Sequence, residues 1–313
     1  MPVTRQTIWL TGSGGFIGSP LALALKQSGM DVRCFTNSAV EVSGEKKREH
    51  DCFYLDYLNK ADIARQVDDR GLPDAFIHVG WGAMANPESP LHLEENVQAG
   101  KILISTLFEL GLSKFIFLGS MNEYGARTGS LVETMKPEGR LTNYAKGKIQ
   151  VAEFGLEVAR RIRRTFIHIR PFYVFGAGQR RGSLINDLYK SYKQGQVPAL
   201  GPCDYYRDYI HVADVVEGIR RISEIDGSTT VNLGSGNVIK LKDFVTLFWK
   251  ALGGNMDTLG FGSRPMRPGE PEQPRSYADL TRLKELTNWA PSRSIEDGID
   301  LTIRVLEQLP PQP

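Results

Sequence analysis

The chain has 313 residues, of which 41% are apolar and 24% charged, and its 38 basic and 36 acidic side chains leave a net charge of +2. This length favours about two domains with a real hydrophobic core. The balanced charge argues against a nucleic-acid partner held by bulk electrostatics. No run of 18 apolar residues occurs and the N-terminus lacks a signal-peptide layout, so we expect neither a membrane span nor secretion.

Cysteine and histidine usage predicts a reducing compartment and no metal site. Cys34, Cys52 and Cys203 are an odd number and form no CxxC pair, which argues against a disulfide framework and against zinc. The histidines lack the spacing of a metal site. We therefore expect a cytoplasmic protein.

Short apolar runs alternate with helical patterns through the first half of the chain. The runs at 8–10, 32–35, 76–79, 115–118 and 166–169 predict strands, and the patterns at 19–28, 96–110 and 143–163 predict helices. This alternation is typical of βαβ units. The sequence therefore predicts an α/β fold with a doubly wound parallel Rossmann sheet.

After Pro171 the regular alternation of strands and helices ends. Glycines and prolines cluster between helical patterns at 184–194, 212–223 and 241–252. We expect a Rossmann domain over residues 1–170 and a smaller C-terminal α/β lobe over 171–313. Part of 208–233 is expected to pack back on the first domain.

A glycine-rich turn follows the first predicted strand. Gly12 permits the turn, Gly15 lets a pyrophosphate approach the backbone, and Gly18 lets the following helix pack closely on the sheet. Phosphates would then lie at the helix N-terminus. An ordinary β–α turn is the alternative, because the spacing is GxxGxxG rather than GxGxxG.

Tyr144 and Lys148 are four residues apart in a predicted helix and thus share one face. A neighbouring ammonium favours the phenolate, so we expect Lys148 to lower the pKa of Tyr144 and make it a proton donor and acceptor. Ser120 follows a strand end, where parallel sheets build their ligand crevices. A surface lysine, a half-buried tyrosine and a capping serine are the alternatives, but their order after the glycine loop favours one catalytic site.

Together these motifs resemble the extended short-chain dehydrogenase/reductases, specifically the nucleotide-sugar epimerase/dehydratase branch. The stretch 11–18 matches TGxxGxxG, Ser120 with Tyr124 and Gly125 matches Ser/Thr-x-x-x-Tyr-Gly, and Tyr144 with Lys148 matches YxxxK. The segment 207–214, RDYIHVAD, is similar to the RDYxHVxD segment of the sugar-nucleotide lobe.

The resemblance implies a role for each matching residue. Tyr144 would be the acid/base, Lys148 would also bind the nicotinamide ribose, and Ser120 would bond the reacting sugar oxygen. The residues implied for the dinucleotide, besides Lys148, are Gly12, Gly15, Phe16, Ile17, Gly18, Thr36, Asp56, His78 and Asn96. Those implied for the nucleotide sugar are Met121, Asn122, Tyr173, Arg207 and Arg267, the two arginines holding its diphosphate.

Three departures from the family pattern limit which reactions and which cofactor we expect. Met121 and Asn122 replace an Asp-Glu pair, which disfavours 4,6-dehydration, and Tyr173 replaces an asparagine. Thr36 stands where NAD-preferring members carry an acid. The candidate cations for a 2′-phosphate are Arg33, Lys46, Lys47 and Arg48.

These features predict an enzyme that uses NADPH, with NAD as the alternative cofactor, on a nucleotide-linked sugar. The favoured reaction is 4-ketoreduction of a 4-keto-6-deoxysugar nucleotide, because Thr36 is neutral and Met121 and Trp81 would make the sugar end of the crevice apolar. The alternatives are a 4-epimerase with tightly bound NAD and, in another class, a non-catalytic protein that senses the dinucleotide. The resemblance also implies a homodimer through helices near 96–110 and 143–163.

Overall fold

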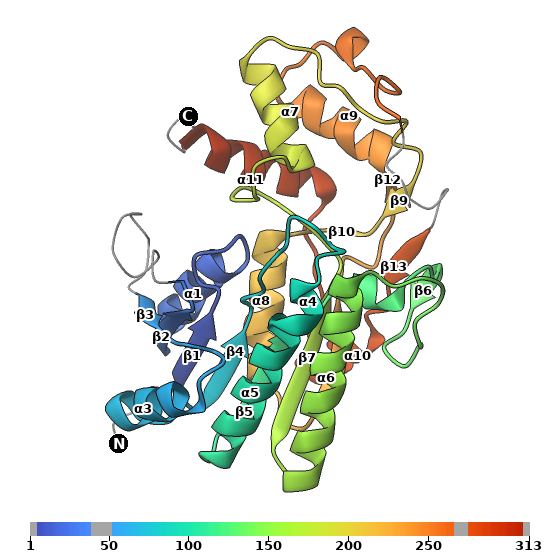
Figure 1. Cartoon of the computed structure of the whole chain (residues 1–313). Coiled ribbons are helices and arrows are strands. Elements are labelled where there is room, and N and C mark those ends of the chain that lie inside the picture. Colours follow the sequence, from blue (N-terminus) through green and yellow to red (C-terminus); the bar gives the residue numbers. More distant parts are fainter. Residues whose placement is uncertain (1–4, 39–51, 266–274, 309–313) are drawn as a thin grey trace.

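The computed structural model describes residues 5–38, 52–265 and 275–308, and a parallel sheet of seven strands lies at its centre (Figure 1). The strand order is β11-β7-β5-β4-β1-β2-β3, and every neighbouring pair is parallel. The strands are β1 (Thr7–Thr11), β2 (Asp31–Thr36), β3 (Cys52–Tyr54), β4 (Ala75–His78), β5 (Lys114–Leu118), β7 (Thr165–Pro171) and β11 (Thr229–Leu233). The predicted parallel sheet is thus confirmed.

Alternate residues of the strands build two different cores. Aliphatic side chains such as Ile8 and Leu10 face α1 (Gly18–Gln27) and α8 (Val212–Ser223). Aromatic side chains such as Trp9 face the other way, against α3 (Lys60–Arg70), α5 (Asn96–Glu109) and α6 (Asn143–Ile162). Helices cover both faces, which explains why the central strands are continuously apolar. This arrangement is the predicted doubly wound fold.

The carboxyl ends of β1 and β5 meet at the same edge of the sheet, because β4 pairs in parallel with both. The glycine loop leaves β1 at this edge. Ser120 leaves β5 at the same edge and begins a short 3₁₀ helix, Met121–Tyr124. The register therefore brings the two predicted halves of the site together.

A second body lies above this edge in Figure 1 and contains α7 (Leu184–Lys193), α9 (Leu241–Ala251) and α11 (Ile295–Gln308). Its core includes Phe244, Phe248 and Trp249. The remaining elements are α4 (Leu91–Glu94), α10 (Thr281–Thr287), a 3₁₀ turn Met256–Thr258 and the strand pairs β6 (Gly129–Leu131) with β13 (Ser276–Ala278), β8 (Tyr173–Phe175) with β10 (Tyr209–His211), and β9 (Tyr206–Arg207) with β12 (Ile239–Lys240).

The chain crosses between the two bodies more than once. β11 comes from the second half of the sequence, yet it lies in the central sheet beside β7. α8 likewise packs against the aliphatic face with α1. Over the three described ranges, no helix is both long enough and apolar enough to cross a membrane.

Candidate active site

The glycine loop packs tightly against the turn that follows β4. Gly12 has φ +75°, and a Cβ there would lie 2.6 Å from the Gly80 backbone nitrogen. A Cβ on Gly18 would overlap the Gly12 carbonyl. The Gly15 amide donates to that carbonyl (2.9 Å), and α1 begins with no side-chain cap at Ile17. The loop thus has the close backbone approach and open helix N-terminus that a pyrophosphate needs.

Two predicted cofactor residues lie beside or beneath this loop. His78 is 3% exposed, and its Nδ1 lies 2.7 Å from the Thr11 hydroxyl oxygen. Burial, with a contribution from Lys148, lowers the pKa of His78 to about 3, so the ring is neutral. Asn96 binds both backbone groups of Gly82, at 3.1 and 3.2 Å. Asn96 therefore holds the turn after β4 in place, whereas His78 links β4 to Thr11 at the end of β1.

The other predicted cofactor residues flank the loop. Phe16 and Ile17 pack partly buried against the aliphatic core. The Thr36 hydroxyl at the end of β2 accepts a hydrogen bond from the Ser38 amide (3.2 Å). The Asp56 carboxylate accepts one from the Leu58 amide (3.0 Å).

Lys148 lies in a closed site at the end of β5. Lys148 is 2% exposed, and its Nζ donates a hydrogen bond to the Leu118 carbonyl oxygen (2.6 Å). The ammonium lies 4.0 Å from the centre of the Trp81 ring and 4.8 Å from that of Phe117. Burial lowers the pKa of Lys148 to about 7, while the negative charge of Glu123 opposes the shift.

Tyr144 lies one residue inside the N-terminus of α6, which Thr142 caps through the Ala145 amide (3.2 Å). Burial raises the pKa of Tyr144 to about 12, a hydrogen bond with the Ser120 side chain lowers it, and Glu123 raises it further. The expectation that Lys148 lowers this pKa is therefore wrong for this geometry. Burial is the largest cause of the opposite shift, and the Lys148 ammonium, 5.9 Å from the centre of the tyrosine ring, donates to Leu118.

The segment after β5 orients Ser120. Its hydroxyl accepts a hydrogen bond from the Asn122 amide (3.2 Å), and its own amide donates to Glu123 Oε1 (2.8 Å). Asn122 is exposed, whereas Met121 is 7% exposed and packs with Tyr124 and other apolar side chains. The Met121 side chain therefore packs in this apolar cluster, and the Trp81 ring packs against Lys148.

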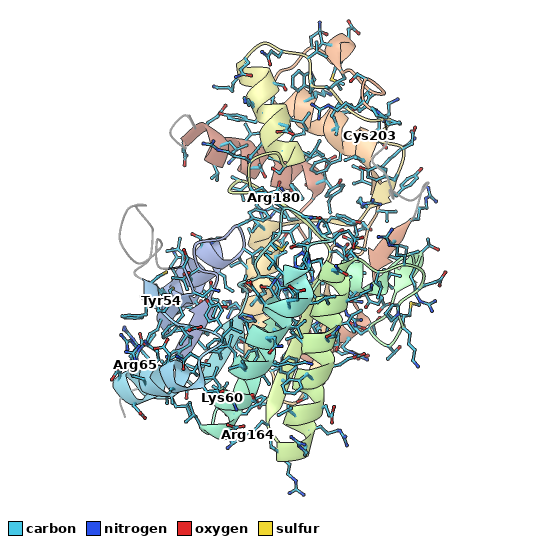
Figure 2. All side chains as sticks on the ribbon, viewed as in Figure 1. Tyr54, Lys60, Arg65, Arg164, Arg180 and Cys203 are labelled. Carbon is cyan, nitrogen blue, oxygen red and sulfur yellow. The ribbon has the colours of Figure 1, made fainter. Side chains whose placement is uncertain are left out.

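A cavity of about 1050 Å³ lies in the second body and reaches Tyr173 and Arg207. Arg207 is 8% exposed, and its guanidinium carbon lies 4.7 Å from the ring centre of Tyr173 and 4.2 Å from that of Tyr205. Arg180 and Arg264 also line the cavity, and Figure 2 labels Arg180 where the two bodies meet. Arg267 lies outside the described residues. With Lys190, the cavity thus offers four cations, two carboxylates (Asp187 and Asp204) and an aromatic wall.

Sequence reasoning missed two groups at this site. Glu123 is 1% exposed, and its carboxylate contacts His168 Nε2 (3.1 Å) and Arg170 Nε (2.9 Å). His92 is fully buried and accepts a hydrogen bond from Trp81 Nε1 at 3.0 Å, which anchors the indole under Lys148. Glu123 could have been predicted from the sequence, because it lies between Ser120 and Tyr124, which both match the family motif. Nothing in the sequence around His92 indicates its role.

The fold, the glycine loop and the grouping of Ser120, Tyr144 and Lys148 define a Rossmann-type enzyme of the dinucleotide-dependent kind. The sequence profile of the NAD dependent epimerase/dehydratase family matches residues 8–234. This match covers more than half of the chain, and the chain belongs to that family.

Similar proteins agree with this assignment. A UDP-glucose 4-epimerase of Erwinia amylovora is 30% identical, over 93% of this chain and 95% of the relative. A UDP-glucuronate 4-epimerase of Thermodesulfobacterium geofontis is 23% identical, over 94% of each chain. Among solved structures, the fold is similar to that of the Thermotoga maritima UDP-glucose 4-epimerase, with a TM-score of 0.83, 21% identity and coverage of 97% of this chain and 99% of the other.

Proposed function

We propose that this enzyme is an NAD-dependent 4-epimerase of a UDP-linked hexose or hexuronic acid. One observation carries the proposal: Ser120, Tyr144 and Lys148 gather at the sheet edge that the glycine loop also occupies. The named activities of the relatives at 30% and 23% identity supply the substrate class.

The side chains divide the proton chemistry between them. Tyr144 takes the proton of the sugar 4-hydroxyl and later returns one, while the Ser120 hydroxyl bonds the same oxygen. When bound, the dinucleotide would supply the hydride chemistry at C4 of the sugar. Gly12, Gly15 and the N-terminus of α1 would hold its pyrophosphate, and Lys148 would bind the ribose beside the reacting carbon. A positively charged nicotinamide ring beside Tyr144 would favour the tyrosinate and offset the burial of Tyr144.

The second-body cavity suits the nucleotide diphosphate. Arg207 is held between two tyrosines and bonded to the Tyr206 carbonyl (2.9 Å), so its remaining donors are pre-oriented. A planar guanidinium matches two phosphate oxygens at once. Arg267 stays a predicted diphosphate ligand.

The side chain of Arg33 is not available for a 2′-phosphate, which favours NAD. Arg33 pairs with Asp31 (3.3 Å) and donates to the Arg70 carbonyl, so it is committed at the end of β2 away from the glycine loop. Lys46, Lys47 and Arg48 lie outside the described residues. The neutral Thr36 side chain does not repel a 2′-phosphate as a carboxylate would, and this favours the second candidate, an NADPH-dependent 4-ketoreductase. One structurally similar protein is the RMD of Pseudomonas aeruginosa complexed with NADPH, with a TM-score of 0.79 and 22% identity.

The purified protein distinguishes the two candidates. We expect stoichiometric NAD to copurify, and UDP-glucose or UDP-glucuronate to yield its 4-epimer without added dinucleotide. Turnover of a 4-keto-6-deoxysugar nucleotide only with added NADPH would establish the reductase instead. Dinucleotide binding without either reaction would support the non-catalytic alternative.

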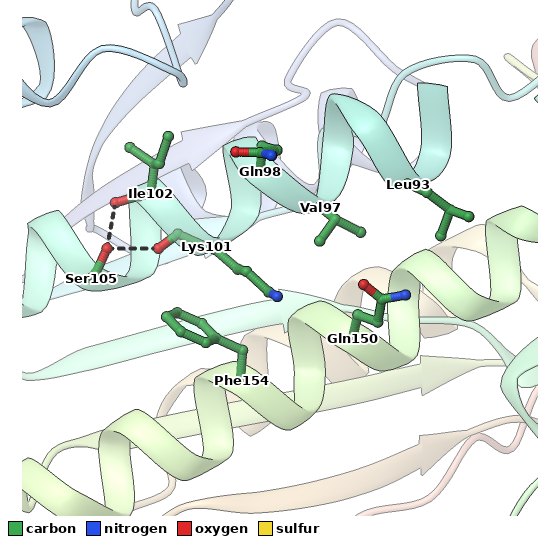
Figure 3. A pocket seen from close by; sticks show the side chains of 8 residues that line it. All are labelled: Leu93, Val97, Gln98, Lys101, Ile102, Ser105, Gln150 and Phe154. Atoms are coloured by element: carbon green, nitrogen blue, oxygen red, sulfur yellow. Dashed lines mark hydrogen bonds between the residues drawn. The ribbon is translucent and has the colours of Figure 1, made fainter. Parts of the chain in front are cut away.

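We also propose a homodimer through the outer face of α5 and α6. Figure 3 shows Lys101 of α5 directed toward Phe154 of α6 in a groove of about 340 Å³. The Lys101 ammonium lies 5.5 Å from the Phe154 ring centre. Val97 and Leu93 add apolar surface to the groove. A two-fold axis here would bury the same patch on both subunits.

A further inference from the structure

Glu123 is a buried carboxylate directly behind the reacting groups. It lies in the 3₁₀ helix after β5, and its side chain is inaccessible to solvent. One oxygen accepts the Ser120 amide (2.8 Å) and contacts His168 Nε2 (3.1 Å), and the other binds Arg170 Nε (2.9 Å). Three donors from two elements therefore fix a single carboxylate.

The packing around this carboxylate is also specific. A Cβ on Gly119 would lie 2.4 Å from Glu123 Oε1 and 2.2 Å from His168 Nε2. Only glycine before Ser120 leaves space for the contact between Glu123 and His168 behind the strand end. Burying a charge of this kind costs several kcal/mol unless it is well paired.

We propose that Glu123 is a positioning residue of the reaction: its carboxylate fixes the Ser120 backbone, and thereby the hydroxyl beside Tyr144, and its charge favours the ammonium form of Lys148. This inference deepens the proposed function and rests on it. Glu123 takes no proton from the substrate, because its oxygens are occupied by Ser120, His168 and Arg170.

Electrostatics support the second half of the proposal. Burial alone would raise the pKa of Glu123, but His168 and Arg170 together lower it below its ordinary value. The carboxylate in turn opposes the drop in the pKa of Lys148 and raises that of Tyr144. The charged and titratable groups facing it are His168 and Arg170 from β7 and Tyr144 and Lys148 from α6.

The chain offers a matched control in Glu133. This glutamate is 7% exposed, accepts the Asn232 amide (2.9 Å), and has a backbone carbonyl that binds the same Arg170 (3.2 Å). Glu133→Gln therefore removes a second buried carboxylate near the same arginine without touching Ser120. Any general effect of lost buried charge should appear in both variants.

The test compares Glu123→Gln, Glu123→Asp and Glu133→Gln by thermal unfolding, by 4-epimerisation of UDP-glucose between pH 6 and 9, and by NADH affinity over the same range. In Glu123→Gln we expect the alkaline midpoint of NADH affinity to move about one pH unit lower, because Lys148 loses its ammonium earlier. In Glu123→Asp the midpoint stays, but kcat falls at least tenfold, because the shorter carboxylate draws Ser120 away. Glu133→Gln should leave both unchanged.

Equal effects of Glu123→Gln and Glu133→Gln would overturn the proposal, as would wild-type kcat in Glu123→Asp. If Glu123→Gln does not fold, Glu123→Asp decides the positioning role, since it keeps the ion pair. Absence of epimerisation in the wild type would count against the proposed function alone. The NADH midpoint needs no sugar and still tests the effect of Glu123 on Lys148.

Discussion

Replacing Lys148 with methionine should change how stability depends on pH. In the folded protein without dinucleotide, the pKa of Lys148 falls from its ordinary 10.5 to about 7, because the ammonium is buried. Between these values the unfolded chain binds about one more proton than the folded one, so the unfolding free energy rises with pH. The slope approaches about 1.4 kcal/mol per pH unit above the folded pKa, and the rise between pH 7 and 9 is about 2 kcal/mol. Lys148→Met lacks this rise.

Urea unfolding at pH 7, 8 and 9 measures the effect as the difference between wild type and Lys148→Met, which cancels the titration of all other groups. The advantage of the variant should be largest at pH 7 and shrink by about 2 kcal/mol at pH 9. Lys146→Met is the control, because Lys146 is exposed on the same helix. Parallel pH dependences of wild type and Lys148→Met would refute the assignment of a buried, discharging lysine.

Three further predictions concern the proposed roles. Tyr144→Phe should lower turnover about 10²–10⁴-fold with unchanged thermal unfolding and NADH affinity, since it removes only the proton donor; turnover within a factor of two of wild type would contradict this. Arg207→Ala should weaken UDP-sugar binding in calorimetry far more than NADH binding, because its guanidinium lines the second-body cavity, and equal losses for both ligands would count against a diphosphate role. Phe154→Arg should convert the expected dimer to a monomer in sedimentation, because it buries a second positive charge beside Lys101 in the α5–α6 groove; a wild-type protein that is monomeric at every concentration would exclude the dimer.

Local sequence patterns were enough to predict most strands and helices of the central sheet and its layers. The five strands expected from apolar runs are found in β1, β2, β4, β5 and β7, and the expected helices at 19–28, 96–110 and 143–163 are found in α1, α5 and α6. The strands could be predicted because a buried parallel strand is continuously apolar. The phosphate-binding loop could be predicted because a glycine-rich turn directly after the first strand is typical of dinucleotide-binding folds. The same turn and the YxxxK spacing identified the family.

Tertiary structure alone decided the electrostatics of the site and part of the topology. Part of 208–233 was expected to pack back on the first domain, but only the tertiary structure shows that β11 pairs with β7 in the central sheet. Helical spacing placed Tyr144 and Lys148 on one face, yet the closed aromatic surroundings raise one pKa and lower the other. Burial and distance set these shifts, and both depend on Trp81, Phe117 and Glu123, which reach the site from separate parts of the chain.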